Sequence, residues 1–563
     1  MTRPAAYSPN PPIPPTPSVQ PPPSGGSRPA PKPPPANAGK DAPSSVKETL
    51  ESILVAFILA FIFRAFVVEA FVIPTGSMAP TLLGAHMRFT CPDCGYQFDV
   101  NYSPKSNGDD MIIPSSSSET YRVFCPNCGF KLPESDVTQP PVHYGDRILV
   151  LKYLYLMREP QRWDVVVFKS PASDDEIHPP TYQQNFIKRL IGKPNESVMI
   201  LDGDIYIGQP GQDRKDYTIQ TKPRWAQEAL WRVIYDNDYH PQQLSRADGS
   251  KWTQPWQVAD GTGWDTNAGP GGREFVFSNT GGSSTLFFNR NAVPIFDRRL
   301  GPHPYAFSDF LAYDAESELQ PYLNFGQMNM VRDLKLRFAY SRKAGDGALR
   351  VRLTSENDQF IAVLTPTEAK LYHKVGDDER QVGSPMAMPS GTDPVTVELV
   401  NADYQATLRI NDQIVAQTTP AEYHPKVASL LNDYDHANLR PPPKVEIEAA
   451  NQQAALSHIG LWRDIYYINR DSQGRVDHGT PKNIMHLNDD EYFVLGDNSL
   501  ISGDARYWEF PIQLPADQLD VRSGIVPGRF LLGRAFFVYW PAGFRPGVPI
   551  GIAPNFGDMR FIR

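Results

Sequence analysis

Two side chains of this chain have the chemistry that acyl transfer needs. Ser77 lies in the turn-rich run PTGSMAP at 74–80, directly after the one long apolar stretch of the sequence. A serine hydroxyl attacks a carbonyl well only when a neighbouring base removes its proton. A lysine can be that base if burial lowers its pKa enough to leave it neutral. The best candidate is Lys188, because its neighbours in NFIKRLIG at 185–192 alternate as in a half-buried strand.

Taken alone, this pair does not establish a catalytic dyad. The eleven histidines are scattered, none lies in a recognisable triad motif, and Gly-x-Ser-x-Gly is absent around Ser77. Lysine is seldom buried, so by itself Lys188 is better interpreted as a surface charge at a strand edge. The two residues therefore indicate a dyad only if other motifs support it.

The four cysteines offer metal-binding chemistry. They form two Cys-x-x-Cys-Gly turns separated by 30 residues, at Cys91, Cys94, Cys125 and Cys128. Two such turns bring four thiolates into tetrahedral reach of one Zn²⁺, and they look like a rubredoxin-type knuckle pair. We predict a structural zinc ribbon over 91–131, with two disulfides as the alternative that an oxidising compartment would permit. A closed four-cysteine site has no open position, so we expect no cofactor in catalysis.

The apolar stretch must position Ser77. It carries no charge over 52–63 and, apart from Arg64 and Glu69, stays apolar to residue 73. About 20 residues at 1.5 Å each span a bilayer, so we predict a transmembrane helix over 47–71. A cleaved leader fits poorly, because a long segment precedes the stretch and no small-x-small site closes it. A buried helix is the other alternative.

The first residues predict a disordered tail. Residues 1–45 hold 16 of the 56 prolines and few large apolar side chains, so we expect 1–46 to be disordered and partly polyproline. Basic residues without an acid before Asp41 favour a cytoplasmic N-terminus and an exported remainder. The net charge of −9, without a basic cluster, argues against a nucleic-acid partner.

An ordered set of motifs surrounds the serine and the lysine. After the serine run come GDRILV at 145–150, RWDVVVF at 162–168, FIKRLIGKPNE at 186–196, and GDNS at 496–499 with SGDARYW at 502–508. In this order they closely resemble the boxes of bacterial type I signal peptidases, which are membrane-bound Ser/Lys endopeptidases. The resemblance covers roughly 49–90, 143–208 and 486–545.

The resemblance implies a role for each matching residue. Ser77 would be the nucleophile and Lys188 the general base, with the Thr75 hydroxyl and the Ser77 amide as the oxyanion hole. Ser502 would hydrogen-bond and orient the lysine. The supporting charged cluster, which would include an Asp-Arg ion pair, is Asp497, Asp504 and Arg506. The apolar walls that accept alanine-sized side chains are Ile73, Pro74, Met78, Leu82, Phe186 and Ile187.

The sequence departs from the family pattern at two places. Glu509 stands where the family usually has glycine, and residues 499–501 are more apolar than the family's polar loop. These differences bear on local loop shape, while every position assigned to the chemistry holds a suitable residue. The resemblance therefore implies an active enzyme, with removal of signal peptides from exported preproteins, after small-x-small motifs, as its reaction.

The resemblance also implies a place in the cell and leaves two rival functions. The chain would be a single-pass protein of the cytoplasmic (inner) membrane with its catalytic domain on the outer, periplasmic side, and its partners would be preprotein signal peptides and the lipid bilayer. One rival is a membrane-tethered binding protein. The other is a self-cleaving repressor-type Ser/Lys peptidase, against which the apolar span and the lack of a DNA-binding module argue.

A long insertion separates the two halves of the resemblance. We predict a mainly β fold with a discontinuous catalytic domain over 72–208 and 485–563, the zinc ribbon, and a β-sandwich insertion over 209–484. Alternation at 334–340 and 395–399 indicates strands, and Asn411-Asp412 reads as a tight hairpin. The insertion looks like a concanavalin-like jelly roll. Such sandwiches often bind glycans, but the fold does not fix the function, so a glycan ligand, a protein ligand and a spacer role all stay open.

Overall fold

The computed structural model describes eleven stretches of the chain. They are 42–103, 105–107, 110–173, 184–242, 251–292, 307–314, 329–391, 393–468, 478–512, 521–541 and 556–563. Most of the tail predicted to be disordered, residues 1–41, lies outside them. The chain falls into two units, residues 1–61 and residues 62–563, and each is described by itself.

The apolar stretch forms helix α1, Ala42–Phe66. Its described apolar side chains are exposed all along its length, for example Leu50 at 61% and Phe57 at 59%. Among the residues that the structure describes, no helix combines the length and the apolarity needed to cross a bilayer. The predicted span of 47–71 is also wrong at its end, because β1 (Val68–Val72) follows the helix and pairs with β6. Valine and phenylalanine favour a strand where a pairing edge is available.

The residues around Ser77 and Lys188 belong to one antiparallel sheet. Its strand order is β1-β6-β30-β7-β9-β27-β29, with β31 paired to β30. The strands are β6 (Arg147–Leu151), β7 (Val165–Lys169), β9 (Asn185–Gly192), β27 (Glu491–Leu495), β29 (Val526–Pro527), β30 (Leu531–Trp540) and β31 (Arg560–Phe561). Strands from both ends of the sequence therefore alternate in this sheet.

Strand β9 lies inside the sheet. It pairs with β7, with Val166 opposite Lys188, and with β27 on its other side. Residues 187–192 are all buried, so β9 is covered on both faces and not half-buried as its sequence pattern predicted. The interpretation of Lys188 as a surface charge at a strand edge is wrong, because its neighbours on both sides cover it.

A second sheet marks where the chain enters and leaves the insertion. Its order is β12 (Thr218–Ile219), β11 (Asp204–Gly208), β10 (Ser197–Leu201) and β26 (Met485–His486). Strand β10 pairs both with β11, before the insertion, and with β26, after it. The two segments thus meet at adjacent points, as an insertion requires. The sheet extends to residue 219, beyond the predicted boundary at 208, and the domain limits stay predictions.

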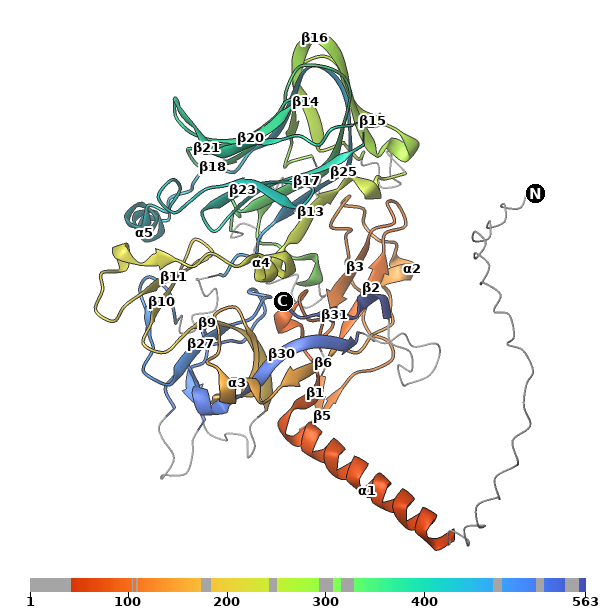
Figure 1. The fold of residues 1–563 in the computed structure, drawn as a ribbon, viewed down its shortest axis with the longest axis vertical. Helices are drawn as coiled ribbons and strands as arrows, with labels where there is room; N and C mark the ends of the chain where they lie inside the picture. Colours follow the sequence, from red (N-terminus) through yellow and green to blue (C-terminus); the bar gives the residue numbers. More distant parts are fainter. Residues whose placement is uncertain are drawn as a thin grey trace, which may run out of the picture. The chain divides into compact units, whose positions relative to one another are not determined.

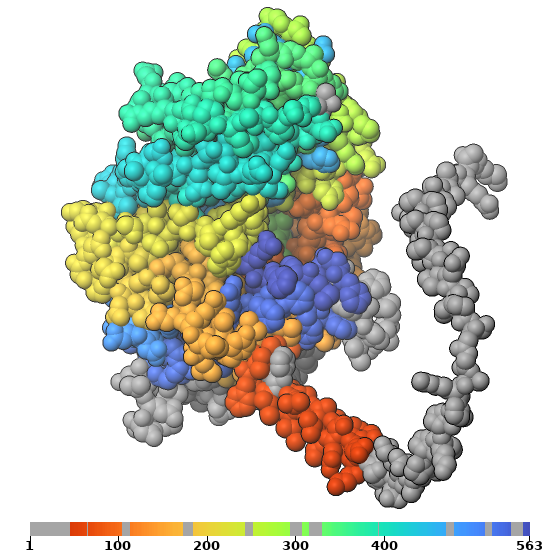
Figure 2. Space-filling model, in the orientation of Figure 1, coloured from red at the N-terminus to blue at the C-terminus, as the bar shows by residue number. Residues whose placement is uncertain are grey.

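The insertion is built from strands, as its alternation predicted. A thirteen-stranded sheet contains β21-β20-β19-β18-β25-β17-β22-β23-β24, joined by β13, β14, β15 and β16. Figure 1 shows β16, β17 and β25 curving together, and in Figure 2 the green and cyan residues of this region gather in one body. The predicted hairpin is confirmed: Ile410 pairs with Gln413, and Asn411 and Asp412 have φ of 49° and 63°.

The bounds of the insertion's elements complete this description. Its helices are α4 (Arg224–Leu230) and α5 (Val427–His436). Its strands are β13 (Arg232–Asp236), β14 (Trp256–Gly261), β15 (Trp264–Ala268), β16 (Glu274–Phe288), β17 (Leu334–Gly345), β18 (Leu349–Ser355), β19 (Asp358–Leu364), β20 (Glu368–Val375), β21 (Asp378–Ala387), β22 (Val395–Ala402), β23 (Gln405–Ile410), β24 (Gln413–Gln417) and β25 (Val445–Arg463).

The cysteine segment packs against the insertion. It contains β2 (His86–Thr90), β3 (Gln97–Asn101), β4 (Lys105–Asn107), β5 (Asp110–Ile112) and α2 (Glu134–Val137). Its buried residues belong to the same hydrophobic cluster as the sandwich strands, from Cys91 through Phe275 to Leu461. Asn127 also accepts a hydrogen bond from the backbone of Asp236 at 2.7 Å. The cysteine segment and the strands of the insertion therefore share one hydrophobic core. Short elements elsewhere are α3 (Leu154–Met157), β8 (Ala172–Ser173) and β28 (Phe510–Pro511).

A buried lysine between β12 and α4 forms ion pairs with carboxylates from later parts of the insertion. Lys222 forms an ion pair with Asp403, and its ammonium lies 2.9 Å from the Asp464 carboxylate. All three residues are buried, at 6%, 2% and 0% exposed. Burial of these charges is tolerated because each one faces an opposite charge.

Removing this lysine should destabilise the fold strongly. Lys222→Met leaves two carboxylates buried without their counter-charge, so we expect the free energy of unfolding to fall by about 3–5 kcal/mol. Urea unfolding followed by tryptophan fluorescence measures the loss. The exposed Lys343→Met is the matched control and should change stability by less than about 0.5 kcal/mol. Equal stability of the two variants would contradict the interpretation.

Candidate active site

Ser77 and Lys188 meet in the structure. Ser77 lies in the short 3₁₀ turn η1 (Gly76–Met78), which follows β1, and Lys188 extends from the central strand β9. The Lys188 Nζ is 2.8 Å from the Ser77 Oγ. Ser77 is partly exposed, whereas Lys188 is only 5% exposed. The amine is therefore hidden from water, and the hydroxyl that it contacts remains reachable.

Burial sets the protonation of the lysine. It lowers the pKa of Lys188 to about 8, because the charged ammonium loses its hydration. The Asp504 carboxylate opposes this effect, and the Arg506 guanidinium supports it. A pKa of about 8 leaves about a tenth of the amines neutral at pH 7 and most of them neutral above pH 9. The geometry and the pKa together suit an amine that takes a proton from the serine.

This pKa predicts the pH dependence of turnover. Only the neutral amine accepts a proton, so kcat/KM should rise about tenfold per pH unit below pH 8 and level off above it. Peptide cleavage measured across this pH range tests the prediction. Lys193→Gln, a change just beyond the end of β9, should leave the midpoint unchanged. A rate that is flat with pH would exclude Lys188 as the base.

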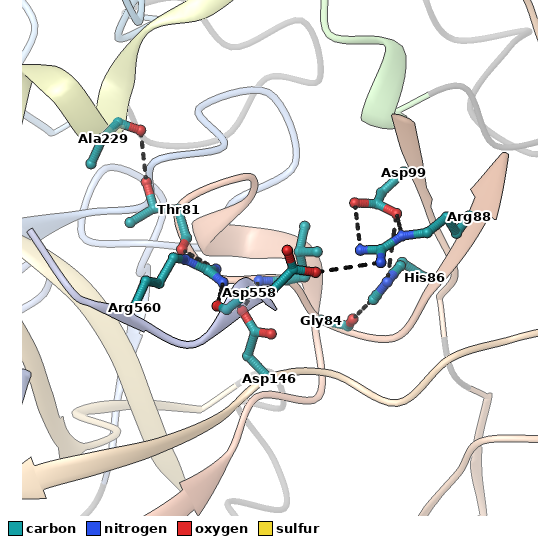
Figure 3. Close-up of polar contacts among 10 residues, drawn as sticks. Thr81, Gly84, His86, Arg88, Asp99, Asp146, Ala229, Asp558 and Arg560 are labelled. Carbon is teal, nitrogen blue, oxygen red and sulfur yellow. Dashed lines mark hydrogen bonds and ion pairs between the residues drawn. The ribbon is translucent and has the colours of Figure 1, made fainter. Parts of the chain in front are cut away.

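The loop after Ser77 is tied to the C-terminal segment. Arg560 donates to the Thr81 carbonyl at 2.9 Å and to the Asp146 carboxylate at 2.8 Å (Figure 3). The same Asp146 oxygen accepts from the Leu83 amide at 3.0 Å. Gly145 is required beside it, because a Cβ there would lie 1.8 Å from the Ile73 carbonyl oxygen. The serine loop is thus fixed by contacts on both of its sides.

A second contact of the C-terminal segment reaches the ribbon. Arg88 on β2 donates from Nε to Asp99 on β3 at 2.8 Å and also faces Asp558 at 3.5 Å (Figure 3). Thr81 contacts the Ala229 carbonyl at 3.5 Å, which links the serine loop to α4. Sequence reasoning missed Arg560 and Asp558, because nothing near the C-terminus resembles a motif.

The charged cluster forms two separate ion pairs. Arg506 holds Asp504 through Nε and Nη2, both at 2.8 Å, so the predicted Asp-Arg pair is confirmed. Asp497 pairs instead with Arg189, at 2.7 Å through each of two nitrogens. All four residues are at most 1% exposed. Arg189 was missed, although its place directly after Lys188 on a strand puts it on the opposite face of the sheet.

Ser502 does not make the expected bond. Its Oγ is buried and has no hydrogen-bond partner among the described residues, so the predicted contact with Lys188 is absent here. The hydroxyl packs against Gly496, where a Cβ would lie 2.1 Å from it and 2.5 Å from the Ser77 carbonyl oxygen. Ser502 therefore lies close to the serine turn but makes no hydrogen bond with the lysine.

Thr75 and the six predicted wall residues differ in how far they are exposed. Thr75 is exposed directly before the serine turn. Ile73, Met78, Leu82 and Ile187 belong to one buried cluster, and Met78 and Leu82 have no exposed surface. Only Pro74 and Phe186 of the six predicted wall residues are partly exposed, and Phe186 packs near Phe168 and Trp508.

A residue of the insertion reaches the serine turn. The Asn498 amide N–H donates to the Ser77 carbonyl at 3.0 Å, and the Asn498 side chain donates to Asp314 at 2.7 Å. Asp314 is completely buried, and burial raises the pKa of its carboxyl to about 7. Its neighbour Tyr313 packs against Gly76, where a Cβ would lie 2.6 Å from the ring. No sequence signal pointed to Asp314, because it lies in the middle of the insertion.

The four cysteines converge as the zinc prediction requires. Their Sγ atoms all lie within 4.8 Å of one another, with 3.7 Å between Cys91 and Cys128 and 3.6 Å between Cys94 and Cys125. Four sulfurs at the usual Zn–S distance of about 2.3 Å would be about 3.8 Å apart, so the residues present fit the ion. All four are buried free thiols, so the structure does not form the alternative disulfides.

Solved structures resemble this chain only weakly. A carbohydrate-binding module CBM66 from Bacillus subtilis covers 37% of this chain and 94% of its own, with 9% identity and a TM-score of 0.22. An apo Crh5 transglycosylase covers 45% of this chain and 98% of its own, with 12% identity and a TM-score of 0.21. Scores this low carry no argument, so the concanavalin-like architecture and its ligand stay predictions.

Sequence comparison identifies relatives of the catalytic segments. A Signal peptidase I of Leptolyngbya laminosa is 32% identical over 109 residues, 18% of this chain and 52% of that protein. A Signal peptidase I of Rickettsia typhi is 26% identical over 172 residues, 31% of this chain and 47% of that protein. The chain spans about half the length of these relatives.

The family signature covers more of the chain. "Signal peptidase, peptidase S26" matches residues 46–101, 130–264 and 394–540. The matched parts contain Ser77, Lys188 and the GDNS and SGDARYW boxes, and they omit most of the ribbon and much of the sandwich. Because the signature covers more than half of the residues, the chain belongs to the signal peptidase family, peptidase S26.

Proposed function

We propose that this protein is a serine endopeptidase that removes signal peptides from exported preproteins. The observation that carries the proposal is the 2.8 Å contact between the Lys188 Nζ and the Ser77 Oγ. The two residues are 111 positions apart in the sequence, so the fold itself brings them together. Membership of the signal peptidase family supports signal-peptide-bearing preproteins as the substrates.

The proposed reaction is acyl transfer through a covalent intermediate. Neutral Lys188 takes the proton of Ser77, and the Ser77 Oγ attacks the carbonyl carbon before the cleavage point. The resulting ammonium gives its proton to the leaving amine nitrogen as the peptide bond breaks. Water, deprotonated by the amine, then attacks the ester carbonyl, and the carboxylic acid product leaves with Ser77 restored.

The Thr75 hydroxyl and the Ser77 amide are proposed to bind the oxyanion. Thr75 is exposed beside the nucleophile, and the Ser77 amide lies at the start of η1, where backbone N–H groups have no partner within the turn. One such donor is worth about 3 kcal/mol of transition-state stabilisation. Thr75→Val should therefore lower kcat by about a hundredfold.

The surrounding residues are proposed to hold and to shape the site. Asp504 with Arg506, and Asp497 with Arg189, would fix the corner behind Lys188, because each pair is buried and doubly hydrogen-bonded. Alanine-sized side chains of a small-x-small motif would lie against Pro74 and Phe186, with the cluster of Ile73, Met78, Leu82 and Ile187 beneath them.

The membrane association is part of the same proposal. The apolar side chains of α1 are exposed around the helix, which is unfavourable in water and favourable against lipid. We propose a single-pass inner-membrane protein whose catalytic domain faces the periplasm. Fractionation of membranes with carbonate, followed by protease accessibility from the outer side, tests this arrangement. The proposed Zn²⁺ in the ribbon would be structural.

The decisive experiment maps the cleavage position. The full-length protein, purified in lipid, is incubated with a preprotein that carries a small-x-small motif, and the new N-terminus is sequenced. We expect one cut directly after that motif. The control is a preprotein with a bulky residue at the position before the cut, which should not be processed. Cleavage elsewhere, or of both substrates alike, would contradict the proposed function.

A further inference from the structure

Three carboxylates from separate parts of the chain meet where the second sheet joins the insertion. Asp204 begins β11, Asp333 directly precedes β17, and Asp403 lies in the turn between β22 and β23. One carboxylate oxygen of each residue lies within 4.8 Å of the corresponding oxygens of the other two. Oxygens that bind one Ca²⁺ lie about 2.3–2.6 Å from it, so two on opposite sides are about 5 Å apart. The three oxygens therefore lie close enough together to contact one such ion.

This acidic cluster carries more negative charge than the lysine beside it can balance. Lys222 pairs with Asp403 and with Asp464, so its single charge already faces two carboxylates. Asp204 and Asp333 form no ion pair with any residue that the structure describes. Burial and the charges of Asp403 and Asp464 raise the pKa of the Asp333 carboxyl to about 8. The cluster therefore has a surplus of negative charge.

The arginines near the acidic cluster do not remove this surplus. Arg332 and Arg440 both form ion pairs with Asp202, and Arg440 also pairs with Glu356. Two carboxylates thus offset these two guanidinium groups, so neither arginine has positive charge left over for the cluster.

Asp204 shows the lack of a partner directly. It is 8% exposed, and its side chain forms no hydrogen bond or ion pair within the part of the chain that the structure describes. Its oxygen faces the like charges of Asp333 and Asp403. The completely buried Tyr206 lies two residues along the same face of β11, and its hydroxyl has no hydrogen-bond partner among the described residues either. Buried carboxylates without partners are unfavourable, and a bound cation would supply the missing counter-charge.

A small cavity lies beside Asp204 and Asp333. Its volume is about 20 Å³, and both residues line it together with Ser355, Tyr404 and Tyr466. A space of this size holds one water molecule or one ion of similar size, and it is too small for an organic ligand. Ca²⁺ binds about six to eight oxygens, so water and hydroxyl groups of this kind would complete its coordination.

We propose that Asp204, Asp333 and Asp403 bind one Ca²⁺ ion, which fastens the second sheet to the strands of the insertion. All three ligands are hard oxygen donors, so they suit Ca²⁺ or Mg²⁺ and not the thiophilic metals that a cysteine site selects. Ca²⁺ accepts irregular sets of carboxylates, whereas Mg²⁺ demands a regular octahedron and keeps several of its waters. Because only the folded chain brings the three residues together, the ion should stabilise the fold. The site is independent of the proposed peptidase activity.

Calcium should raise the melting temperature of the protein. The full-length protein is purified in an uncharged detergent, dialysed against calcium-free buffer and melted with and without CaCl₂. A concentration of about 10 mM exceeds the dissociation constants of roughly 10⁻⁴–10⁻³ M that extracellular calcium modules have. We expect a rise of about 5 °C with CaCl₂ and less than half of that with MgCl₂ at the same concentration. No rise with CaCl₂, or an equal rise with MgCl₂, would overturn the proposal.

Asp204→Asn separates a ligand from a structural residue. The change removes one charge at constant size, and it relieves repulsion because Asp204 has no partner, so the melting temperature without calcium should rise or stay the same. The calcium-dependent rise should fall below about 1 °C in this variant. The matched control, Asp377→Asn in the exposed turn between β20 and β21, should keep the full rise. If Asp204→Asn does not fold, Asp333→Asn decides. A full rise in the folded variant would overturn the proposal.

Terbium luminescence locates the ion. Tb³⁺ binds oxygen sites as Ca²⁺ does and emits light when a nearby tyrosine is excited, and Tyr404 and Tyr466 line the cavity. We expect emission with the wild-type protein that CaCl₂ displaces. Loss of one carboxylate in Asp204→Asn should weaken Tb³⁺ binding at least about tenfold. Emission and affinity that persist unchanged in Asp204→Asn would place the ion elsewhere and overturn the proposal.

Discussion

Ser77→Ala and Lys188→Met should each abolish cleavage of a preprotein while the protein remains folded. The expected loss in kcat is at least about 10⁴-fold, because the nucleophile and its base act as one unit. Ser77→Ala removes the attacking oxygen. Lys188→Met keeps an unbranched apolar chain in the buried position on β9 and removes only the amine that lies 2.8 Å from Ser77.

The controls for the dyad distinguish chemistry from folding. Because Lys188 is buried and forms no ion pair with any residue that the structure describes, Lys188→Met should raise thermal stability or leave it unchanged, and both variants should show the circular dichroism of the wild type. The double variant should lose no more activity than either single variant. Multiplicative losses in the double variant, or near-normal turnover in either single variant, would show that the two residues do not work together.

Loss of the proposed Zn²⁺ should unfold the cysteine segment. Metal analysis of the purified protein should find about one zinc per chain. Binding of Zn²⁺ to four thiolates contributes roughly 10–16 kcal/mol in isolated zinc domains. Cys91→Ser with Cys125→Ser takes one ligand from each knuckle, so we expect zinc to be lost and the melting temperature to fall. The Ser135→Ala change on the exposed surface of α2 is the control.

The same experiment tests the alternative chemistry of the cysteines. Two disulfides would lower the intact mass by about four hydrogens, bind no zinc and resist chelators but not reductants. A protein that has no zinc and the full melting temperature would therefore contradict the ribbon proposal.

The sequence predicted the structure correctly where a local pattern favours one conformation strongly. The alternation at Leu334, Leu336 and Phe338 predicted a strand, and all three are buried on β17. Asn411-Asp412 predicted the hairpin, because asparagine and aspartate tolerate positive φ. The alternation around Lys188 made it the best candidate base but favoured a surface position, and the ordered set of motifs then decided for the dyad.

The features that the sequence did not predict correctly are set by contacts between distant parts of the chain or by packing. Arg189, Asp314 and Arg560 act through partners that are 308, 184 and 414 residues away, and no local pattern reveals such distances. The end of the apolar helix was misplaced because apolarity does not distinguish a helix from a strand that is covered by a neighbour. The Ser502 contact was taken from a resemblance, whereas the hydroxyl here packs against Gly496.

The contact between Asp314 and Asn498 joins the insertion to the proposed catalytic centre. A shortened enzyme without residues 209–484 would lose the carboxylate that orients Asn498 and the ring that covers Gly76. Its serine loop would keep the contacts with Asp146 and Arg560. Protein engineers should therefore treat the two parts as co-adapted and exchange them only together.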